Sequence, residues 1–169
     1  DAALKADIRA DVDLRVEVIE PILEMLKPEI AAKNMVLECP QAETPPRIEC
    51  DPGMIRIALG NLLTNAIKYG RVGGVIRVGL TLDNALVCLT VWNEGPGFAA
   101  ADRSKLFLKF VRLDNPEFRN EKGTGVGLYS TWRIMQLHHG RVTARSEEGV
   151  WAEFTLSLPA RQDQDVEES

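Results

Sequence analysis

The chain carries the sequence Gly123-Thr124-Gly125-Val126-Gly127-Leu128 directly before a segment with helical periodicity. A second glycine turn, Asn93-Glu94-Gly95-Pro96-Gly97-Phe98, precedes it, and both follow a predicted helix that projects Asn61, Asn65 and Lys68 from one side. Glycine turns let backbone amides approach phosphate, because no Cβ stands in the way, and the positive end of a following helix adds to the attraction. One glycine run is common in surface turns. Three elements in this order indicate a nucleotide site.

The overall composition is that of one compact globular domain. Its 169 residues are 45% hydrophobic and 27% charged, which suits a chain long enough to bury a core. A net charge of −5 with no basic run argues against nucleic-acid binding. No apolar stretch approaches the ~20 residues of a membrane span, and no signal peptide is visible. We therefore expect a cytoplasmic segment without direct membrane contact.

The three cysteines, Cys39, Cys50 and Cys88, lie in apolar, strand-like surroundings and lack C-x-x-C spacing. We expect reduced, buried thiols, and we favour this interpretation over a zinc site or a disulfide.

Apolar periodicity and turn residues divide the chain into alternating helices and strands. Asp51 and Pro52 resemble an N-cap followed by proline in the first helical turn, and Gly70 marks the end of that helix. A long polar loop between the two glycine turns is typical of a lid or binding segment. The expected helices are 13–33, 52–69 and 126–138, and the expected strands are 35–39, 47–50, 75–81, 85–92, 141–145 and 151–158, with a turn at 83–84.

The helix over 52–69 has two distinct faces. At about 100° per residue, one arc holds Ile55, Leu59, Leu62 and Ala66 and faces the core, and the other holds Asn61, Asn65, Lys68 and Tyr69. The polar arc could be a solvated surface, yet asparagines cost helix propensity. A carboxamide oxygen can ligate Mg²⁺ without adding negative charge, and a lysine can reach phosphate as a point charge. The tyrosine ring could lie along a base or ribose.

Four segments together resemble the conserved boxes of sensor histidine kinases in the GHKL superfamily of ATP-binding domains. Residues 59–69 are similar to the N box, Asn93-x-Gly95-x-Gly97 to the first glycine box, 106–110 to the F box, and 123–128 to the second glycine box. The similarity runs over about 13–159, in family order. It implies the Bergerat fold, a two-layer α/β sandwich with a mixed, mostly antiparallel sheet, helices on one face, and a mobile ATP lid at about 98–124. The resemblance makes 1–12 a remnant of a preceding dimerisation helix or linker. The acidic, polar composition of 160–169 predicts a disordered tail.

The same resemblance implies roles for individual residues. It makes Asn65 the Mg²⁺ ligand, gives Asn61 and Lys68 catalytic contacts to the phosphates, and places Tyr69 at the nucleoside. Asn93 replaces an aspartate that accepts a hydrogen bond from adenine, and its neutral amide can still accept that bond more weakly. The remaining expected nucleotide-binding residues are Gly95, Gly97, Phe98, Lys122, Gly123, Thr124, Gly125, Val126, Gly127 and Leu128.

Other positions depart from the family pattern or have two interpretations. Trp151-Ala152 stands where the family has Gly-Thr, so a hydroxyl near adenine is missing, and His139 stands where glycine is common. Phe107 and Phe110 fit lid packing as well as a direct role. Arg112 fits a phosphate or partner contact as well as a solvent-exposed side chain.

Position 61 separates the activities found in the superfamily. Its ATPases and serine kinases tend to carry a glutamate there, which can deprotonate water or a hydroxyl, whereas Asn61 cannot. A histidine acceptor is nucleophilic as neutral imidazole, so the asparagine favours a histidine kinase. A degenerate domain that binds nucleotide weakly and acts as an interaction scaffold is the alternative, suggested by Asn93 and Ala152. A stand-alone serine kinase or ATPase is disfavoured.

The phosphoacceptor is expected on another domain. The only histidines, His138 and His139, lack the acceptor context H-[DE]-x-x-x-P, and we interpret them as surface or capping residues. The resemblance therefore implies two partners, the dimerisation and phosphoacceptor domain of the same kinase and the receiver domain of a response regulator, with ATP and Mg²⁺ as cofactors.

Overall fold

A five-stranded mixed sheet forms one layer of the protein. The computed structural model describes residues 4–40, 44–107 and 126–162. In the strand order β2-β4-β5-β7-β6, the pair β2·β4 is parallel and the other three pairs are antiparallel, as predicted. The strands are β2 (Val36–Glu38), β4 (Val75–Asp83), β5 (Leu86–Glu94), β6 (Arg141–Glu147) and β7 (Trp151–Pro159).

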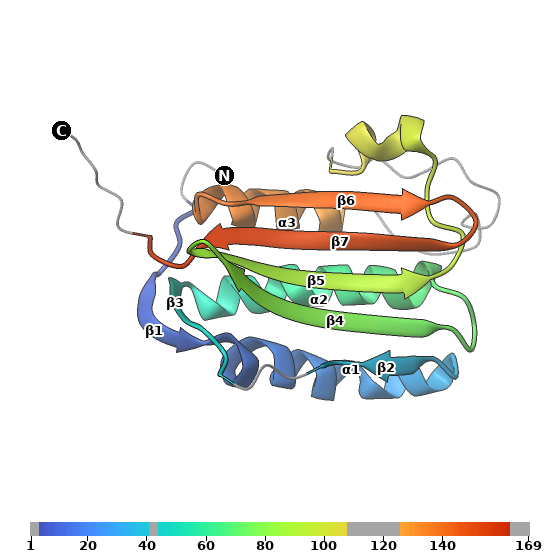
Figure 1. Ribbon diagram of the computed structural model, residues 1–169, viewed down its shortest axis with the longest axis horizontal. Coiled ribbons are helices and arrows are strands. Elements are labelled where there is room, and N and C mark those ends of the chain that lie inside the picture. Colours follow the sequence, from blue (N-terminus) through green and yellow to red (C-terminus); the bar gives the residue numbers. More distant parts are fainter. Residues whose placement is uncertain (1–3, 41–43, 108–125, 163–169) are drawn as a thin grey trace.

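Three helices form the second layer and cover one face of this sheet (Figure 1). They are α1 (Glu20–Ala32), α2 (Pro52–Tyr69) and α3 (Val126–Leu137). Side chains alternate along β5, so that Val87, Leu89 and Val91 are buried toward the helices. Burial of these side chains against α2 closes the core, and the predicted two-layer α/β sandwich is confirmed.

The other face of the sheet carries a row of cations and aromatic rings. The guanidinium of Arg77 lies 4.6 Å from the ring centroid of Trp92, and that of Arg145 lies 5.5 Å from Trp151. The two tryptophan rings stack with 6.4 Å between centroids. This row runs across β4, β5, β7 and β6 and adds side-chain contacts between neighbouring strands.

The ends of α2 follow from local chemistry. The side chain of Asp51 accepts a hydrogen bond from the amide of Met54 at 3.1 Å, which confirms the predicted N-cap. Gly70 ends the helix in an extended conformation, so it is not needed for a left-handed turn. A Cβ there would instead press on the carbonyl oxygen of Ala66 and the methyl group of Met35. Gly70 is thus required by close packing.

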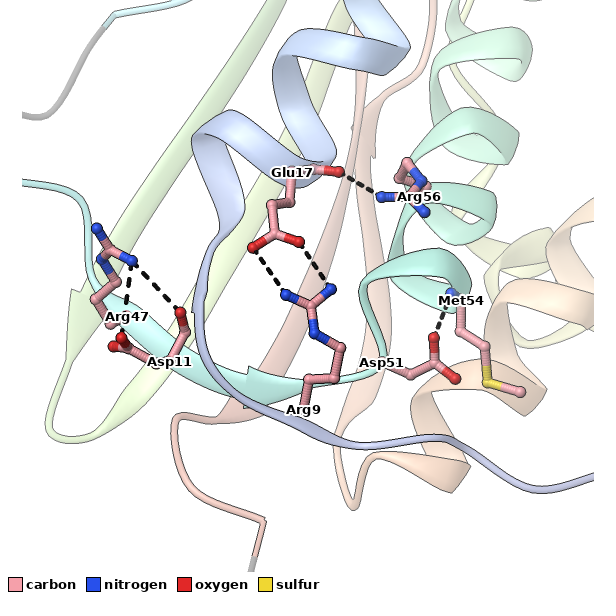
Figure 2. A network of polar contacts seen from close by, with 7 residues as sticks. All are labelled: Arg9, Asp11, Glu17, Arg47, Asp51, Met54 and Arg56. Carbon is pink, nitrogen blue, oxygen red and sulfur yellow. Dashed lines mark hydrogen bonds and ion pairs between the residues drawn. The ribbon is translucent and has the colours of Figure 1, made fainter.

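The N-terminal segment contributes a strand that the sequence did not predict. β1 (Arg9–Asp13) pairs antiparallel with β3 (Arg47–Cys50), whereas this part of the chain was expected to be a helix remnant or linker. Figure 2 shows Arg9 reaching both carboxylate oxygens of Glu17, at 2.9 and 3.3 Å, and Arg56 donating to the Glu17 carbonyl at 2.7 Å. These contacts join β1 to the helical layer.

Some boundaries differ from the predicted ones. The helix expected over 13–33 begins with a π-helical turn at Arg15–Ile19 and continues as α1, with Pro28 accommodated inside it. The β4–β5 turn lies one residue later than predicted, because Asp83 pairs with Leu86 and the loop is Asn84 and Ala85, both at positive φ. A short 3₁₀ helix covers Ala100–Lys105. Among the described residues, no helix has the length and hydrophobicity to span a membrane.

All three cysteines are free thiols. Cys50 is fully buried, as expected, while Cys39 and Cys88 are half-buried. Burial raises the pKa of the Cys39 thiol, and the nearby charge of Glu20 adds to this effect.

Candidate nucleotide-binding site

Helix α2 carries four of the predicted site residues. Ile55, Leu59 and Leu62 on its apolar arc are fully buried, which confirms the core face. The residues of the polar arc are half-buried; they are Asn61, Asn65, Lys68 and Tyr69. Within the described part of the chain, no hydrogen bond occupies the carboxamide of Asn65. Its oxygen is therefore available to a ligand.

Asn61 connects α2 to the first turn of α3. Its Nδ2 donates to the carbonyl of Gly127 at 2.9 Å and to Oγ1 of Thr131 at 3.3 Å, and the Thr131 hydroxyl donates to the same Gly127 carbonyl at 3.0 Å. Thr131 is fully buried. The start of α3, where the second glycine turn ends, is thus fixed against α2 by a closed set of hydrogen bonds.

The first glycine turn meets the opposite end of α2. A Cβ on Gly95 would stand 2.8 Å from the carbonyl oxygen of Tyr69 and 3.1 Å from the Cα of Gly70. The amide of Arg71 donates to the Glu94 carbonyl at 2.8 Å. Only glycine at position 95 allows this contact, which brings the first glycine turn beside the last turn of the asparagine helix.

Gly97 and Phe98 are held by strand β6. Gly97 has φ +63°, and a Cβ there would meet Oγ of Ser146 and the carbonyl of Trp151. The Phe98 amide donates to the Ser146 hydroxyl at 2.9 Å, and that hydroxyl donates to the Phe98 carbonyl at 3.1 Å. The Phe98 ring is buried and lies 6.1 Å from that of Phe154. The structure therefore places this ring in the core, and its predicted contact with nucleotide stays a prediction.

Asn93 presents a buried acceptor at the start of the first glycine turn, near the end of β5. It is 5% exposed, and its Nδ2 donates to the Glu94 carbonyl at 3.1 Å, which fixes the orientation of the amide. Among the residues that the structure describes, no donor reaches its Oδ1. A buried oxygen without a partner is costly unless a ligand supplies the donor. Ala152 is the cross-strand partner of Asn93, so these two departures from the family pattern are neighbours.

Part of the predicted set lies outside the described residues. Lys122, Gly123, Thr124 and Gly125 fall there, as do Phe110, Arg112 and most of the expected lid. Val126 begins α3, and Leu128 packs partly buried against the core. Phe107 packs edge-on against Phe154 with 6.1 Å between centroids, which agrees with the packing interpretation of that side chain.

Three residues that hold the site were missed by the sequence analysis. Thr131 has a weak signal, because it follows Gly127 by one helical turn. No sequence signal indicates the role of Ser146, because its partner Phe98 is 48 residues away. His138 was expected at the surface or as a cap, yet it is fully buried between Ile134 and Asp51.

Comparison with known proteins agrees with this geometry. Residues 50–162 match the family model described as histidine kinase-, DNA gyrase B-, and HSP90-like ATPase. The chain belongs to this family. The matched segment of this ATPase domain begins just before the Asp51 cap and includes α2, both glycine turns and α3. β1, α1 and β2 lie before the match, although they pack in the same fold.

Individual proteins and solved structures resemble this chain over most of its length. The adaptive-response sensory kinase SasA of Synechococcus sp. (strain JA-3-3Ab) is 33% identical over 159 residues, which are 94% of this chain and 42% of that protein. The chain thus spans less than half of this relative. Full-length ShkA in complex with AMPPNP aligns with a TM-score of 0.81 and 25% identity, over 93% of this chain and 32% of that one. Histidine kinase ThkA in complex with the response regulator TrrA aligns with a TM-score of 0.78 and 21% identity, over 95% of this chain and 44% of that one.

Proposed function

We propose that this chain is the catalytic ATP-binding domain of a sensor histidine kinase, which transfers the γ-phosphoryl group of ATP to a histidine on a separate domain. The observation that carries the proposal is the arrangement along α2. Asn61 is bonded to Gly127 at one end of the polar arc, and Gly95 packs on Tyr69 at the other. Gly127 of the second glycine turn and Gly95 of the first therefore both contact α2. The family and its kinase relatives support ATP as the ligand.

The arrangement suits a nucleotide that lies along α2. The eight-residue separation of Asn61 and Tyr69 corresponds to about 12 Å of helix. The unsatisfied Oδ1 of Asn93 accepts the adenine amino group at one end, and the amides at the start of α3 bind phosphate at the other. The Asn65 carboxamide oxygen would hold Mg²⁺, which neutralises phosphate charge when bound. Lys68 adds a positive charge from the same face.

The amide at position 61 determines which acceptor fits. Because Nδ2 of Asn61 is committed to Gly127 and Thr131, this side chain works as a connector and offers no basic group. The acceptor must then be nucleophilic without prior deprotonation. A neutral imidazole attacks the γ-phosphorus with its nitrogen lone pair, the bond to the β-phosphate oxygen breaks, and ADP leaves.

The acceptor histidine is proposed to lie on a dimerisation and phosphoacceptor domain. Both ring nitrogens of His138 are occupied, one by Ile134 and one by the amide of Asp51, so this buried imidazole is unsuited to accept a phosphoryl group. The receiver domain of a response regulator would take the group in the next transfer. We place these reactions in the cytoplasm, where ATP is available.

Incubation with γ-labelled ATP tests the transfer. We expect label to appear on the phosphoacceptor domain only when both domains are present, and to be stable to base and labile to acid. The Asn65→Ala variant should lose this labelling. Strong labelling of the isolated chain itself would contradict the proposal.

A thermal shift separates this function from the scaffold alternative, which Asn93 and Ala152 favour. Mg-ATP at 100 times its Kd should stabilise the domain by roughly 2.7 kcal/mol. An unchanged melting temperature at millimolar Mg-ATP would favour the scaffold alternative, a domain that no longer binds nucleotide.

A further inference from the structure

Lys33 makes a set of contacts that neither the family resemblance nor the sequence pattern indicates. It follows directly after α1, and its Nζ donates to the carbonyl oxygens of Ile67, Lys68 and Gly70 at 2.6, 3.0 and 3.0 Å. An ammonium group has three N–H donors. All three are thus directed at one short stretch of backbone, 34 to 37 residues further along the chain.

These carbonyls belong to the end of α2, where helices leave carbonyl groups without intrahelical partners. The ammonium satisfies two of them and places a positive charge at the negative end of the helix dipole. The main chain of Lys33 adds a further contact, because its carbonyl accepts from the Gly73 amide at 2.9 Å. Both the side chain and the backbone of Lys33 therefore hold the turn that leaves α2.

The held turn carries one end of the candidate site. Lys68 and Tyr69 project from it, and Gly70 lies against Gly95 and Asn93. A displacement of the turn would move the lysine expected at phosphate relative to the asparagine expected at adenine. Small displacements of this kind lower affinity and rate in a site that depends on the exact placement of its residues.

We propose that Lys33 is a positioning residue of the nucleotide site, whose ammonium fixes the last turn of α2 and thereby the placement of Lys68. Lys33 acts through backbone carbonyls and does not touch the nucleotide. This inference rests on the proposed function.

The test compares the Mg-ATP affinity of the wild type and a set of variants by calorimetry, at a temperature where circular dichroism shows each to be folded. Lys33→Met removes the three donors and keeps the apolar stem, and we expect about a tenfold rise in Kd. Lys27→Met is the matched control, because it removes the same charge from the exposed surface of α1, where Lys27 forms an ion pair with Glu24 at 3.4 Å. Its Kd should equal that of the wild type.

A double-mutant cycle separates positioning from general weakening. If Lys33 acts through Lys68, then Lys33→Met should raise Kd clearly less in a Lys68→Ala background than in the wild type. Equal rises in both backgrounds would show a merely structural role and overturn the inference.

A second substitution of Lys33 tests the inference if Lys33→Met does not fold. Lys33→Arg keeps the charge, but a planar guanidinium cannot direct three donors at the same convergent carbonyls. We expect a several-fold rise in Kd that again depends on Lys68, and wild-type affinity would overturn the proposal. If the wild-type chain itself binds no Mg-ATP, the proposed function fails and this inference fails with it. If the wild type binds and Lys33→Met behaves like Lys27→Met, only the role of Lys33 is wrong.

Discussion

The Nε2 atom of His138 accepts a hydrogen bond from the backbone amide of Asp51, with 3.0 Å between the two nitrogens. Its Nδ1 lies 2.9 Å from the carbonyl oxygen of Ile134 and donates to it, so both contacts require the neutral ring protonated on Nδ1. This histidine joins the end of α3 to the residue that caps α2. The two helices that carry the candidate site are thus connected at this end by an uncharged imidazole.

Stability should therefore depend on pH through His138. Burial lowers its pKa, and this effect outweighs the Ile134 hydrogen bond and the Asp51 charge, which act in the opposite direction. In the unfolded chain histidine titrates near pH 6.5, so below that value the unfolded state binds more protons than the folded state. The contribution of His138 to the free energy of unfolding should be complete above about pH 6.5. It should be lost as the pH falls toward the pKa of His138 in the folded state.

Urea unfolding from about pH 5 to pH 8 measures this dependence. The wild type should lose stability as the pH falls, and the control His139→Asn should do so with a slightly shallower slope, because the nearby charge of His139 adds a small part of the lowering of the His138 pKa. His138→Gln should be less stable at neutral pH and show a shallower dependence. Identical slopes in His138→Gln and the wild type would contradict the assignment.

His139 occupies a position that favours glycine. It has φ +58° and lies two residues beyond the end of α3, and the Gly140 amide closes the helix by donating to the Met135 carbonyl at 2.9 Å. His139→Gly should raise the free energy of unfolding by about 1 kcal/mol, because it removes left-handed strain. Gln136→Gly, one turn earlier and exposed, should lower it by about 0.5–1 kcal/mol. A loss of stability in His139→Gly, measured by urea denaturation, would refute this expectation.

Gly97 and Gly73 both have positive φ but differ in their surroundings. A Cβ at Gly97 would meet Ser146 and the Trp151 carbonyl, whereas a Cβ at Gly73 has no atom within 4 Å. Gly73→Ala should cost about 1 kcal/mol of stability from backbone strain, and Gly97→Ala about 2–4 kcal/mol, because packing conflict is added. Thermal denaturation of the two variants makes the comparison, and equal losses would show that the close contacts of Gly97 contribute nothing.

Replacing Asn61 by aspartate should break the connection between α2 and α3. The carboxylate cannot donate and would face the Gly127 carbonyl, so we expect a loss of about 1–3 kcal/mol in unfolding free energy. Asn65→Asp, one turn away on the same face, is the control and should change it by less than about 0.5 kcal/mol. Urea denaturation without nucleotide reports this difference, and the prediction is wrong if the two losses are equal.

Asn93→Asp should change stability and affinity in opposite directions. A carboxylate would face the Glu94 carbonyl in place of the Nδ2 donor, which lowers the stability of the free domain. It would also bind the adenine amino group more strongly, by about 1 kcal/mol or roughly fivefold in Kd. Asn93→Leu keeps the side-chain size, and it should abolish nucleotide binding because it removes the acceptor. Calorimetry with Mg-ATP checks both variants, and unchanged affinity in Asn93→Leu would exclude an adenine contact at this position.

Local sequence chemistry predicted most of the elements. The Asp51 cap, the strand at Arg47–Cys50 and the apolar arc of α2 depend on residues a few positions apart, and the structure confirms them. The β4–β5 turn was displaced by one residue, because the register of the long hairpin places Ala85 in a left-handed conformation that its own preference opposes.

The contacts that hold the site were harder to predict. The Asn61–Thr131 bond joins residues 70 positions apart, and the Lys33 contacts, the Ser146 clamp on Phe98 and the β1–β3 pairing are also distant in sequence. No periodicity or spacing links such residues. The boxes could therefore be recognised from the sequence, while the side chains that position them required the three-dimensional arrangement.

The pairing of β1 with β3 also governs the chemistry of one thiol. Cys50 is the partner of Arg9 in this pair. Burial, with the charges of Asp51 and Glu17, raises the pKa of the Cys50 thiol to about 12, although the charge of Arg9 acts in the opposite direction. Thiols react as thiolates, so Cys50 is inert toward alkylating reagents while the pair is intact. Detachment of β1 would admit water and restore an ordinary thiol. The alkylation of Cys50 would then record how often the segment entering the domain separates from it.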